Sequence, residues 1–195
     1  MLNQALTIIK LDMNTHKSEE PLDWIARFVP LVKSDGTFLD VACGNGRHAR
    51  YLINLGYQVT AMDRDISAIR KSKNADSIEL IEADLEDGSP WPLGSRKFDG
   101  IIVSNYLYRP LFPAIIDALD DDGILIYETF SLGNEKYGRP SNPNFLLKPG
   151  ELLSACSDEL RVIAYEDGLL KTPSPAVKQR ICAIKSPFDG LPSPL

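Results

Sequence analysis

Short apolar runs and amphipathic stretches alternate along most of this 195-residue chain. Apolar runs rich in β-branched residues are typical of buried strands, whereas apolar residues three or four positions apart are typical of helices. The pattern predicts strands at Thr37–Cys43, Gln58–Asp63, Ser77–Asp84, Lys97–Asn105 and Gly123–Phe130. Helices are expected between several of them, at Arg47–Gly56, Ile66–Lys73 and Leu111–Leu119.

The two ends of this region add further elements. Pro21 suits a first helical turn and Trp24, Ile25 and Phe28 form an apolar stripe, so a short helix is expected before the first strand. Near the C-terminus, PGELLSACS predicts a helix, and ELRVIAYED and AVKQRICAIK predict two strands that could pair as a hairpin. The whole pattern predicts an α/β fold with a doubly wound, mostly parallel sheet and a C-terminal antiparallel strand pair.

Length and composition favour one folded domain, residues 21–185, between an N-terminal tail, 1–20, and a C-terminal tail, 186–195. Neither a signal peptide nor a membrane span of about 20 apolar residues is recognisable. Cys43, Cys156 and Cys182 are far apart, which argues against a disulfide framework and against a zinc site. We therefore expect a cytoplasmic protein with no metal site and no membrane contact.

The net charge of −6 bears on the binding partner. A long phosphate backbone favours a basic surface, and the only dense basic run is Arg70, Lys71 and Lys73. We interpret this run as the solvated end of a helix. The charge therefore argues against a nucleic-acid partner and favours a small-molecule substrate, while the oligomeric state stays open.

One connection, Ser131–Lys148, is longer than the others. In compact domains, loops of more than about 12–15 residues are uncommon, and they are usually functional or disordered. This loop leaves the carboxyl end of a predicted central strand, and its Tyr137, Arg139 and Phe145 are not typical of a flexible linker. We expect it to form a lid on the substrate side, with Tyr137 and Arg139 as substrate contacts.

The stretch FLDVACGNGRHARYL, Phe38–Leu52, joins the first predicted strand to a helix through a glycine loop. Gly44 and Gly46 would let a ligand come close to the backbone, although a tight turn could need glycines for no functional reason. The GxGxxA pattern would also suit a nicotinamide or flavin site. The loop alone therefore does not identify a ligand.

Carboxylates at three predicted strand ends narrow the choice of ligand. Asp40, Asp63 and Asp84 should converge at one edge of the sheet, because the carboxyl ends of parallel strands meet there. Asp63 suits the paired hydrogen bonds of a ribose diol. Asp40 would repel a pyrophosphate but could hold an ammonium group. S-adenosylmethionine carries an ammonium group, a sulfonium, a ribose and an adenine, without a phosphate.

In their order, these motifs resemble those of the class I S-adenosylmethionine-dependent methyltransferases. LDVACGNG is similar to the first motif, with Cys43 where a glycine is most common, and VTAMDRD and IEADLED are similar to the ribose and adenine segments. FDGIIVSNYL and GILIYETF are similar to the fourth and fifth strand motifs. The resemblance covers roughly Pro21–Lys185 and extends to the small bacterial members related to tellurite-resistance-type methyltransferases. It implies a seven-stranded Rossmann-like sheet, S-adenosylmethionine as cofactor, and a small or medium-sized methyl acceptor.

The resemblance also implies roles for individual positions. The residues expected to bind the cofactor are Asp40, Ala42, Gly44, Gly46, Asp63, Arg64, Asp84, Leu85 and Ser104. Asn105 and Tyr108 are expected to contact the substrate. The candidate catalytic residues are Tyr106, Glu128 and His48, although an acceptor that is already ionised needs no base.

Arg47 and His48 place positive charge at the start of a predicted helix, where the helix dipole disfavours it. They could point outward, pair with acids such as Asp40, or meet an anion. That anion could be the methionine carboxylate of the cofactor or an acidic substrate.

Two other functions fit parts of the pattern. A NAD-dependent oxidoreductase would use the glycine loop and Asp63, but it leaves Asp40 and the long loop unexplained. A non-catalytic module that binds S-adenosylmethionine would keep the whole pocket. SNYL, after the fourth strand, lacks the N-P-P-Y pattern of amino-methylating nucleic-acid enzymes. Nothing in the sequence identifies the methyl acceptor.

Overall fold

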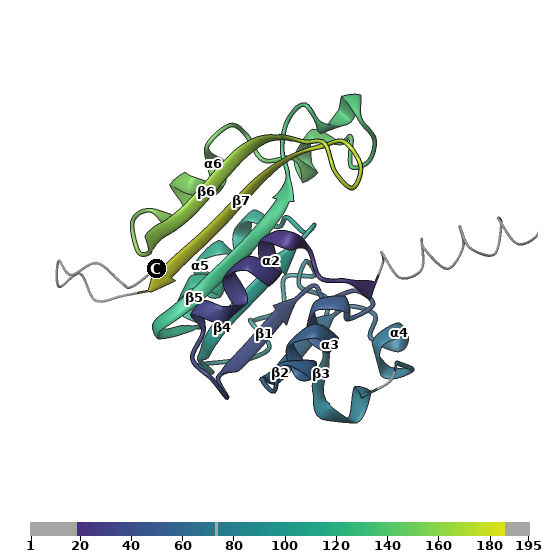
Figure 1. The fold of residues 1–195 in the computed structure, drawn as a ribbon, viewed down its shortest axis with the longest axis vertical. Helices are drawn as coiled ribbons and strands as arrows, with labels where there is room; N and C mark the ends of the chain where they lie inside the picture. The colour runs from purple at the N-terminus through teal and green to yellow at the C-terminus, as the bar shows by residue number, and fades with distance from the viewer. Residues whose placement is uncertain (1–18, 73, 186–195) are drawn as a thin grey trace, which may run out of the picture.

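The computed structural model describes residues 19–72 and 74–185 (Figure 1). The tails expected at 1–20 and 186–195 lie outside these residues, apart from Glu19 and Glu20. Within the described part of the chain, no helix has the length and hydropathy needed to cross a membrane.

One seven-stranded sheet runs through the molecule in the order β3-β2-β1-β4-β5-β7-β6. Its first five strands are parallel, and β7 runs antiparallel to both of its neighbours, β5 and β6. The predicted doubly wound sheet with an antiparallel strand pair is therefore confirmed. The strands are β1 (Thr37–Val41), β2 (Gln58–Asp63), β3 (Ile78–Glu82), β4 (Phe98–Ser104), β5 (Leu119–Phe130), β6 (Arg161–Leu170) and β7 (Ala176–Lys185).

Each face of the sheet carries its own hydrophobic core, because successive strand residues point to opposite faces. Ile101 of β4 packs in one core and Ile102 in the other. One face is covered by α2 (Asp23–Phe28), α3 (Arg47–Asn54) and α4 (Ser67–Arg70), and the other by α5 (Phe112–Asp117) and α6 (Glu151–Cys156). Figure 1 shows α2 and α3 in front of the strands. Short 3-10 helices are η1 (Val29–Leu31), η2 (Ala75–Ser77), η3 (Arg109–Leu111), η4 (Asn134–Lys136) and η5 (Pro143–Phe145).

Helix α2 is the helix that the apolar stripe after Pro21 predicts. Trp24, Ile25 and Phe28 are all buried against the sheet. The indole N–H of Trp24 donates a hydrogen bond to the carbonyl of Ile181 in β7, at 3.2 Å. This contact fixes α2 across the C-terminal half of the sheet.

Most predicted elements shift by one to three residues at an end, and two differ most in length. Strand β5 begins at Leu119 rather than Gly123, and its pairing with β4 shifts register between Phe98 and Gly100. The helix expected at Ile66–Lys73 is a single turn, α4. It ends early because Ser72 donates both its backbone N–H and its hydroxyl to the carbonyl of Ile69. Local hydrophobic periodicity predicts neither the earlier start of β5 nor the early end of α4.

The strand order places the reversal of the sheet between β1 and β4. In open α/β sheets, ligands bind in the crevice outside the carboxyl ends of the strands at this point. The glycine loop, 42–46, follows β1 there, and Asn105 and Tyr106 follow β4. The fold therefore places the candidate residues of the sequence at the edge where a ligand is expected.

Candidate functional site

The glycine loop between β1 and α3 has a left-handed backbone at Ala42, Gly44 and Gly46, with φ of 52°, 55° and 74°. This conformation favours glycine. A Cβ atom on Gly46 would lie 2.2 Å from Cδ1 of Ile69, whereas a Cβ atom on Gly44 would meet nothing within 4 Å. Gly46 therefore allows α3 to pack closely on α4, and Gly44 is the position that leaves open space beside the loop.

Asp63, the last residue of β2, joins the end of that strand to the glycine loop. Its Oδ2 accepts a hydrogen bond from the backbone N–H of Gly44 at 2.8 Å, and its Oδ1 accepts one from the N–H of Asp65 at 3.1 Å. A carboxylate oxygen has more than one acceptor position. Both oxygens can therefore accept further hydrogen bonds from a ligand.

A cavity of about 440 Å³ opens beside these residues, and we term it the glycine-loop cavity. It contains six of the predicted cofactor-binding residues, Ala42, Asp63, Arg64, Asp84, Leu85 and Ser104. The other residues that line it are Ala83, Glu86, Asn105, Tyr106 and Phe145. The ends of β2 and β4, the segments that follow β1, β2, β3 and β4, and Phe145 of η5 thus surround one space.

Asp40 lies below the glycine loop, and its side chain is buried. Oδ2 accepts a hydrogen bond from the N–H of Ala49 at 3.1 Å, but Oδ1 is buried and has no partner in the part of the chain that the structure describes. Burial raises the pKa of Asp40 to about 7, although the Ala49 N–H and the charge of Arg47 oppose the shift. A buried acceptor without a partner is costly. The site therefore suits a ligand that brings a donor or a positive charge to Oδ1.

The cysteine of the loop is not set up as a nucleophile. Burial, followed by the charges of Asp40 and Asp63, raises the pKa of the Cys43 thiol. A thiol is a much weaker nucleophile than a thiolate. Within residues 19–72 and 74–185, no three His, Cys, Asp or Glu side chains gather in a way that could hold a metal ion.

A second cavity, of about 500 Å³, lies beside the turn between β6 and β7, and we term it the hairpin cavity. Asn105 lines both cavities. It follows β4 with a left-handed φ of 54°, and its backbone N–H donates to the carbonyl of Glu128 at 2.8 Å. The remaining lining residues are Glu20, Pro21, Leu22, Asp23, Arg47, Glu128, Phe130, Leu170, Thr172, Pro173, Ser174, Ala176, Lys178 and Arg180.

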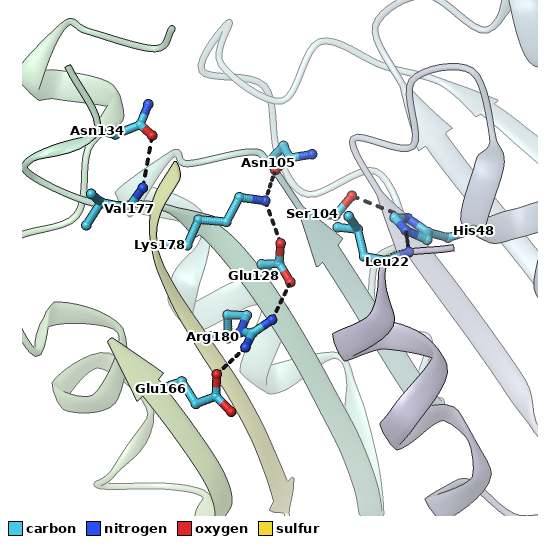
Figure 2. A network of polar contacts seen from close by, with 10 residues as sticks. All are labelled: Leu22, His48, Ser104, Asn105, Glu128, Asn134, Glu166, Val177, Lys178 and Arg180. Atoms are coloured by element: carbon cyan, nitrogen blue, oxygen red, sulfur yellow. Dashed lines mark hydrogen bonds and ion pairs between the residues drawn. The ribbon is translucent and has the colours of Figure 1, made fainter. Parts of the chain in front are cut away.

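A buried ionic network reaches the boundary between the two cavities (Figure 2). Nζ of Lys178 donates to Oε1 of Glu128 at 2.5 Å and to Oδ1 of Asn105 at 2.8 Å. Arg180 lies 3.9 Å from Oε2 of Glu128 and also pairs with Glu166. The network connects the middle of β7 to the side chain that separates the cavities.

Lys178 and Arg180 are site residues that were not predicted from the sequence. The available signal is their spacing in AVKQRICAIK, because residues two apart in a strand point to the same face. Two cations on one face of an otherwise apolar strand need buried partners. The pairing of β5 with β7 supplies one by placing Glu128 opposite Arg180.

His48 is buried in α3, and both of its ring nitrogens have partners within the chain. Nε2 lies 3.3 Å from the backbone N–H of Leu22, and Nδ1 lies 3.3 Å from the hydroxyl of Ser104. Because the Leu22 N–H can only donate, Nε2 is the acceptor and Nδ1 carries the proton in this arrangement. Burial, followed by the charge of Arg47, lowers the pKa of His48 to about 3. The ring is therefore neutral and ties α3 to β4 and to the start of α2.

The predicted substrate contacts fall into two groups. Asn105 lines both cavities, whereas Tyr108, Tyr137 and Arg139 line neither of them. Tyr106 lines the glycine-loop cavity, and burial, with the nearby charge of Glu86, raises the pKa of its hydroxyl. Tyr106 is therefore a neutral phenol at ordinary pH.

The long loop, 131–148, is anchored at several points. Leu147 is buried, and its N–H donates to the carbonyl of Phe130 at 2.9 Å. Arg109 donates to the carbonyl of Leu146 and pairs with Glu151. Asn134 accepts a hydrogen bond from the N–H of Val177 at 3.1 Å. Phe145 lies at the rim of the glycine-loop cavity with 48% of its surface exposed, so the loop reaches the site through this ring.

Comparisons with known proteins agree with this geometry. Residues 38–121 match the model of a family described as a methyltransferase domain. A search of curated proteins finds no significant match. Among solved structures, TehB from Haemophilus influenzae is 18% identical with a TM-score of 0.66, and the alignment covers 84% of this chain and 62% of that one. The chain therefore spans less than two thirds of the length of that TehB chain.

Two further structures match over nearly their whole length. A TehB-like S-adenosylmethionine-dependent methyltransferase from Corynebacterium glutamicum is 17% identical with a TM-score of 0.64, and the alignment covers 95% of this chain and 100% of that one. An S-adenosylmethionine-dependent methyltransferase from Methanosarcina mazei is 16% identical with a TM-score of 0.64, with 86% and 99% covered. The expected class I resemblance is confirmed: residues 38–121 match the methyltransferase-domain model, and the chain has the fold of the class I methyltransferases, with TehB and a TehB-like protein among its structural relatives.

Proposed function

We propose that this protein transfers a methyl group from S-adenosylmethionine to a small or medium-sized acceptor. Two observations carry the proposal: the buried Oδ1 of Asp40 has no partner among the described residues, and open space lies beside Gly44 in the loop that follows β1. An amino-acid ammonium group would satisfy that oxygen, and the open loop leaves room for the rest of the amino acid. A pyrophosphate would meet an acidic group there instead, which disfavours NAD.

The other cofactor contacts follow from the glycine-loop cavity. Asp63 would accept hydrogen bonds from the two ribose hydroxyls, and Asp84 and Leu85 would lie at the adenine. Asp84 keeps its position through an Asx turn, in which its Oδ1 accepts from the N–H of Glu86 at 2.9 Å. Phe145, across the cavity from the strand ends, would cover the bound nucleoside.

Bound S-adenosylmethionine supplies a methyl group that is already activated by its sulfonium. The residues of this chain then have two tasks, to align the acceptor with that methyl group and to exclude water. Asn105 is placed for the first task, because it lies between the cavities and Lys178 fixes its side-chain oxygen.

Of the three predicted catalytic residues, two already have partners that use the atoms a base would need. The Nε2 lone pair of His48 accepts the Leu22 N–H, and Glu128 pairs with Lys178. We propose that His48 positions Leu22 and Ser104, and that Glu128 positions Lys178. Tyr106 remains a candidate hydrogen-bond donor at the cofactor.

Calorimetric titration with S-adenosylhomocysteine, with NAD in parallel, tests the proposal. We expect saturable one-to-one binding of S-adenosylhomocysteine and no binding of NAD. Binding of NAD alone would favour an oxidoreductase, and binding of neither ligand would contradict the proposal. A non-catalytic module would bind S-adenosylhomocysteine but would form no product from labelled S-adenosylmethionine with any acceptor in a broad screen.

We also propose that the protein works in the cytoplasm and that its acceptor is a small molecule. All three cysteines are free thiols, which suits a reducing compartment. The net charge of −6 disfavours a nucleic-acid acceptor.

The binding of S-adenosylhomocysteine is expected to weaken as the pH falls through about 7, the raised pKa of Asp40. The reason is that the ligand's ammonium group attracts the ionised carboxylate and not the protonated one. Below that pKa, the affinity should fall by up to about tenfold per pH unit. Titrations between about pH 8 and about pH 5.5 measure this dependence. Asp40→Asn should bind more weakly, and a pH dependence that persists in this variant would assign it to another group.

Without ligand, Asp40 should affect stability with the opposite sign. Its pKa is 3.8 in the unfolded chain and about 7 in the folded one, so the folded state favours the protonated form. Its contribution to stability is therefore present at low pH and is lost as the pH rises from about 4 to about 7. Asp40→Asn should remove this part of the pH dependence of the melting temperature.

A further inference from the structure

The inner part of the hairpin cavity contains cations whose hydrogen-bond donors are not all used by its buried acids. Lys178 has three N–H donors, of which Glu128 and Asn105 take two. Arg47 is half-buried, and within the described residues no hydrogen bond or ion pair holds its guanidinium group. Burial lowers the pKa of Arg47, and the charges of Asp40 and Glu128 oppose this shift. Both cations can therefore contact a further anion.

The acids of this cavity lie in different surroundings. Glu128 is buried and belongs to the network with Lys178 and Arg180. Glu20 and Asp23 are exposed at the mouth of the cavity, next to the start of α2. Solvent and salt screen exposed charges much more than buried ones. The inner end therefore favours an anion although the lining contains as many acids as bases.

The remaining walls of the hairpin cavity are largely apolar. The ring of Phe130 faces Lys178, whose Nζ lies 4.8 Å from the ring centroid. Leu170 comes from the end of β6, at the start of the turn to β7. The apolar lining residues are Pro21, Leu22, Phe130, Leu170, Pro173 and Ala176. A cavity with these walls and cations at one end suits a molecule with an apolar body and one negative group.

We infer that the hairpin cavity binds the methyl acceptor, and that this acceptor is a small organic anion. Its negative group lies between Arg47 and Lys178, and its apolar body lies against Phe130 and Leu170. The inference rests on the proposed function, because the positive sulfonium at the Asn105 boundary adds to the attraction of an anion and repels an ammonium-bearing acceptor. An inorganic oxyanion would meet the cations but would leave the apolar walls uncovered.

The test uses the full chain saturated with S-adenosylhomocysteine and a matched pair of probes, benzoate and benzamide. The two have nearly the same shape and differ in charge. We expect the affinity for benzoate to be higher than that for benzamide by a factor of about ten or more, which is what one charge-assisted hydrogen bond would provide. Sulfate serves as the inorganic probe and should bind more weakly than benzoate.

Arg47→Gln is the main variant, because the change breaks no ion pair among residues 19–72 and 74–185. Measured well above the pKa of Asp40, which burial raises and the charge of Arg47 lowers, it should reduce the preference for benzoate to near unity and leave the affinity for S-adenosylhomocysteine unchanged. Arg50→Gln is the matched control on the same helix, since Arg50 donates to the carbonyl of Asn45 and does not line the cavity. It should retain the preference for benzoate.

The outcomes separate the inference from the proposed function. Equal binding of benzoate and benzamide, or binding of sulfate as tight as that of benzoate, would overturn the inference. A loss of S-adenosylhomocysteine affinity in Arg47→Gln well above the pKa of Asp40 would also overturn it, because Arg47 would then hold the carboxylate of the cofactor. Failure of the wild-type chain to bind S-adenosylhomocysteine, measured before any probe is added, would instead contradict the proposed function.

Discussion

Asp63→Ala is expected to weaken the binding of S-adenosylhomocysteine by about 100-fold or more. In the proposed complex, the Asp63 carboxylate accepts hydrogen bonds from both ribose hydroxyls, and each bond to a charged group contributes about 1.5–3 kcal/mol. The substitution also removes the acceptor of the Gly44 N–H, which holds the glycine loop against β2. Calorimetry at one pH, with a thermal melt of each variant, measures the binding and stability effects separately.

Two further variants separate the causes of the affinity lost in Asp63→Ala. Asp63→Asn keeps an oxygen for the Gly44 N–H but loses the charge, so it should bind between the wild type and Asp63→Ala. Asp65→Ala is the matched surface control, because the exposed Asp65 carboxylate accepts from Ser67 two positions on and does not line the cavity. Unchanged affinity in Asp63→Ala would remove Asp63 from the site.

The part of the fold that positions the cofactor could be predicted because its signals are local. The central parallel strands are buried on both faces and therefore form short apolar runs, such as Gln58–Asp63, whose predicted bounds are those of β2. Parallel strands bring their carboxyl ends together, so chain order alone places Ala42, Asp63 and Asp84 around one cavity. For these residues, sequence position determines spatial position.

The acceptor side could not be predicted in the same way, because its contacts join distant segments. Lys178 and Glu128 are 50 residues apart, and only the register of the antiparallel β5–β7 pair brings them together. Similarly, His48 was a plausible base until the fold placed Leu22 and Ser104 at its two nitrogens. Hydrophobic periodicity carries no information about such pairings, and the chemistry of a side chain depends on them.

The long loop shows the limit of predicting function from loop length. Its length pointed to a functional segment, and Phe145 does line the glycine-loop cavity. Tyr137 and Arg139 are exposed and line neither cavity, so their contact with substrate stays a prediction. Phe145 differs from Tyr137 and Arg139 because Arg109 holds the neighbouring Leu146 against the domain. This contact could not be predicted from the sequence.

Glu128→Gln is expected to destabilise the folded protein by about 3–5 kcal/mol, the usual effect of removing one partner from a buried ion pair. Lys178 is only 8% exposed, and the substitution would leave its charge without an anion in the described part of the site. For a domain of this size, the melting temperature should fall by about 10 °C. Glu166→Gln is the matched control: Glu166 pairs with Arg180, but its side chain is 46% exposed, so the loss should stay below about 1 kcal/mol.

The double variant Glu128→Leu with Lys178→Met decides what the ion pair contributes. Apolar replacements for a buried pair are often neutral for stability or stabilising, so the double variant should regain most of the loss seen in Glu128→Gln. It would also free the Asn105 side chain, which Lys178 holds at the boundary between the cavities. A stable double variant that binds S-adenosylhomocysteine normally but has lost its preference for benzoate would show that the pair serves the acceptor site. If Glu128→Gln melted like the wild type, the charge of Lys178 would not depend on Glu128, and the ion pair would not contribute to stability.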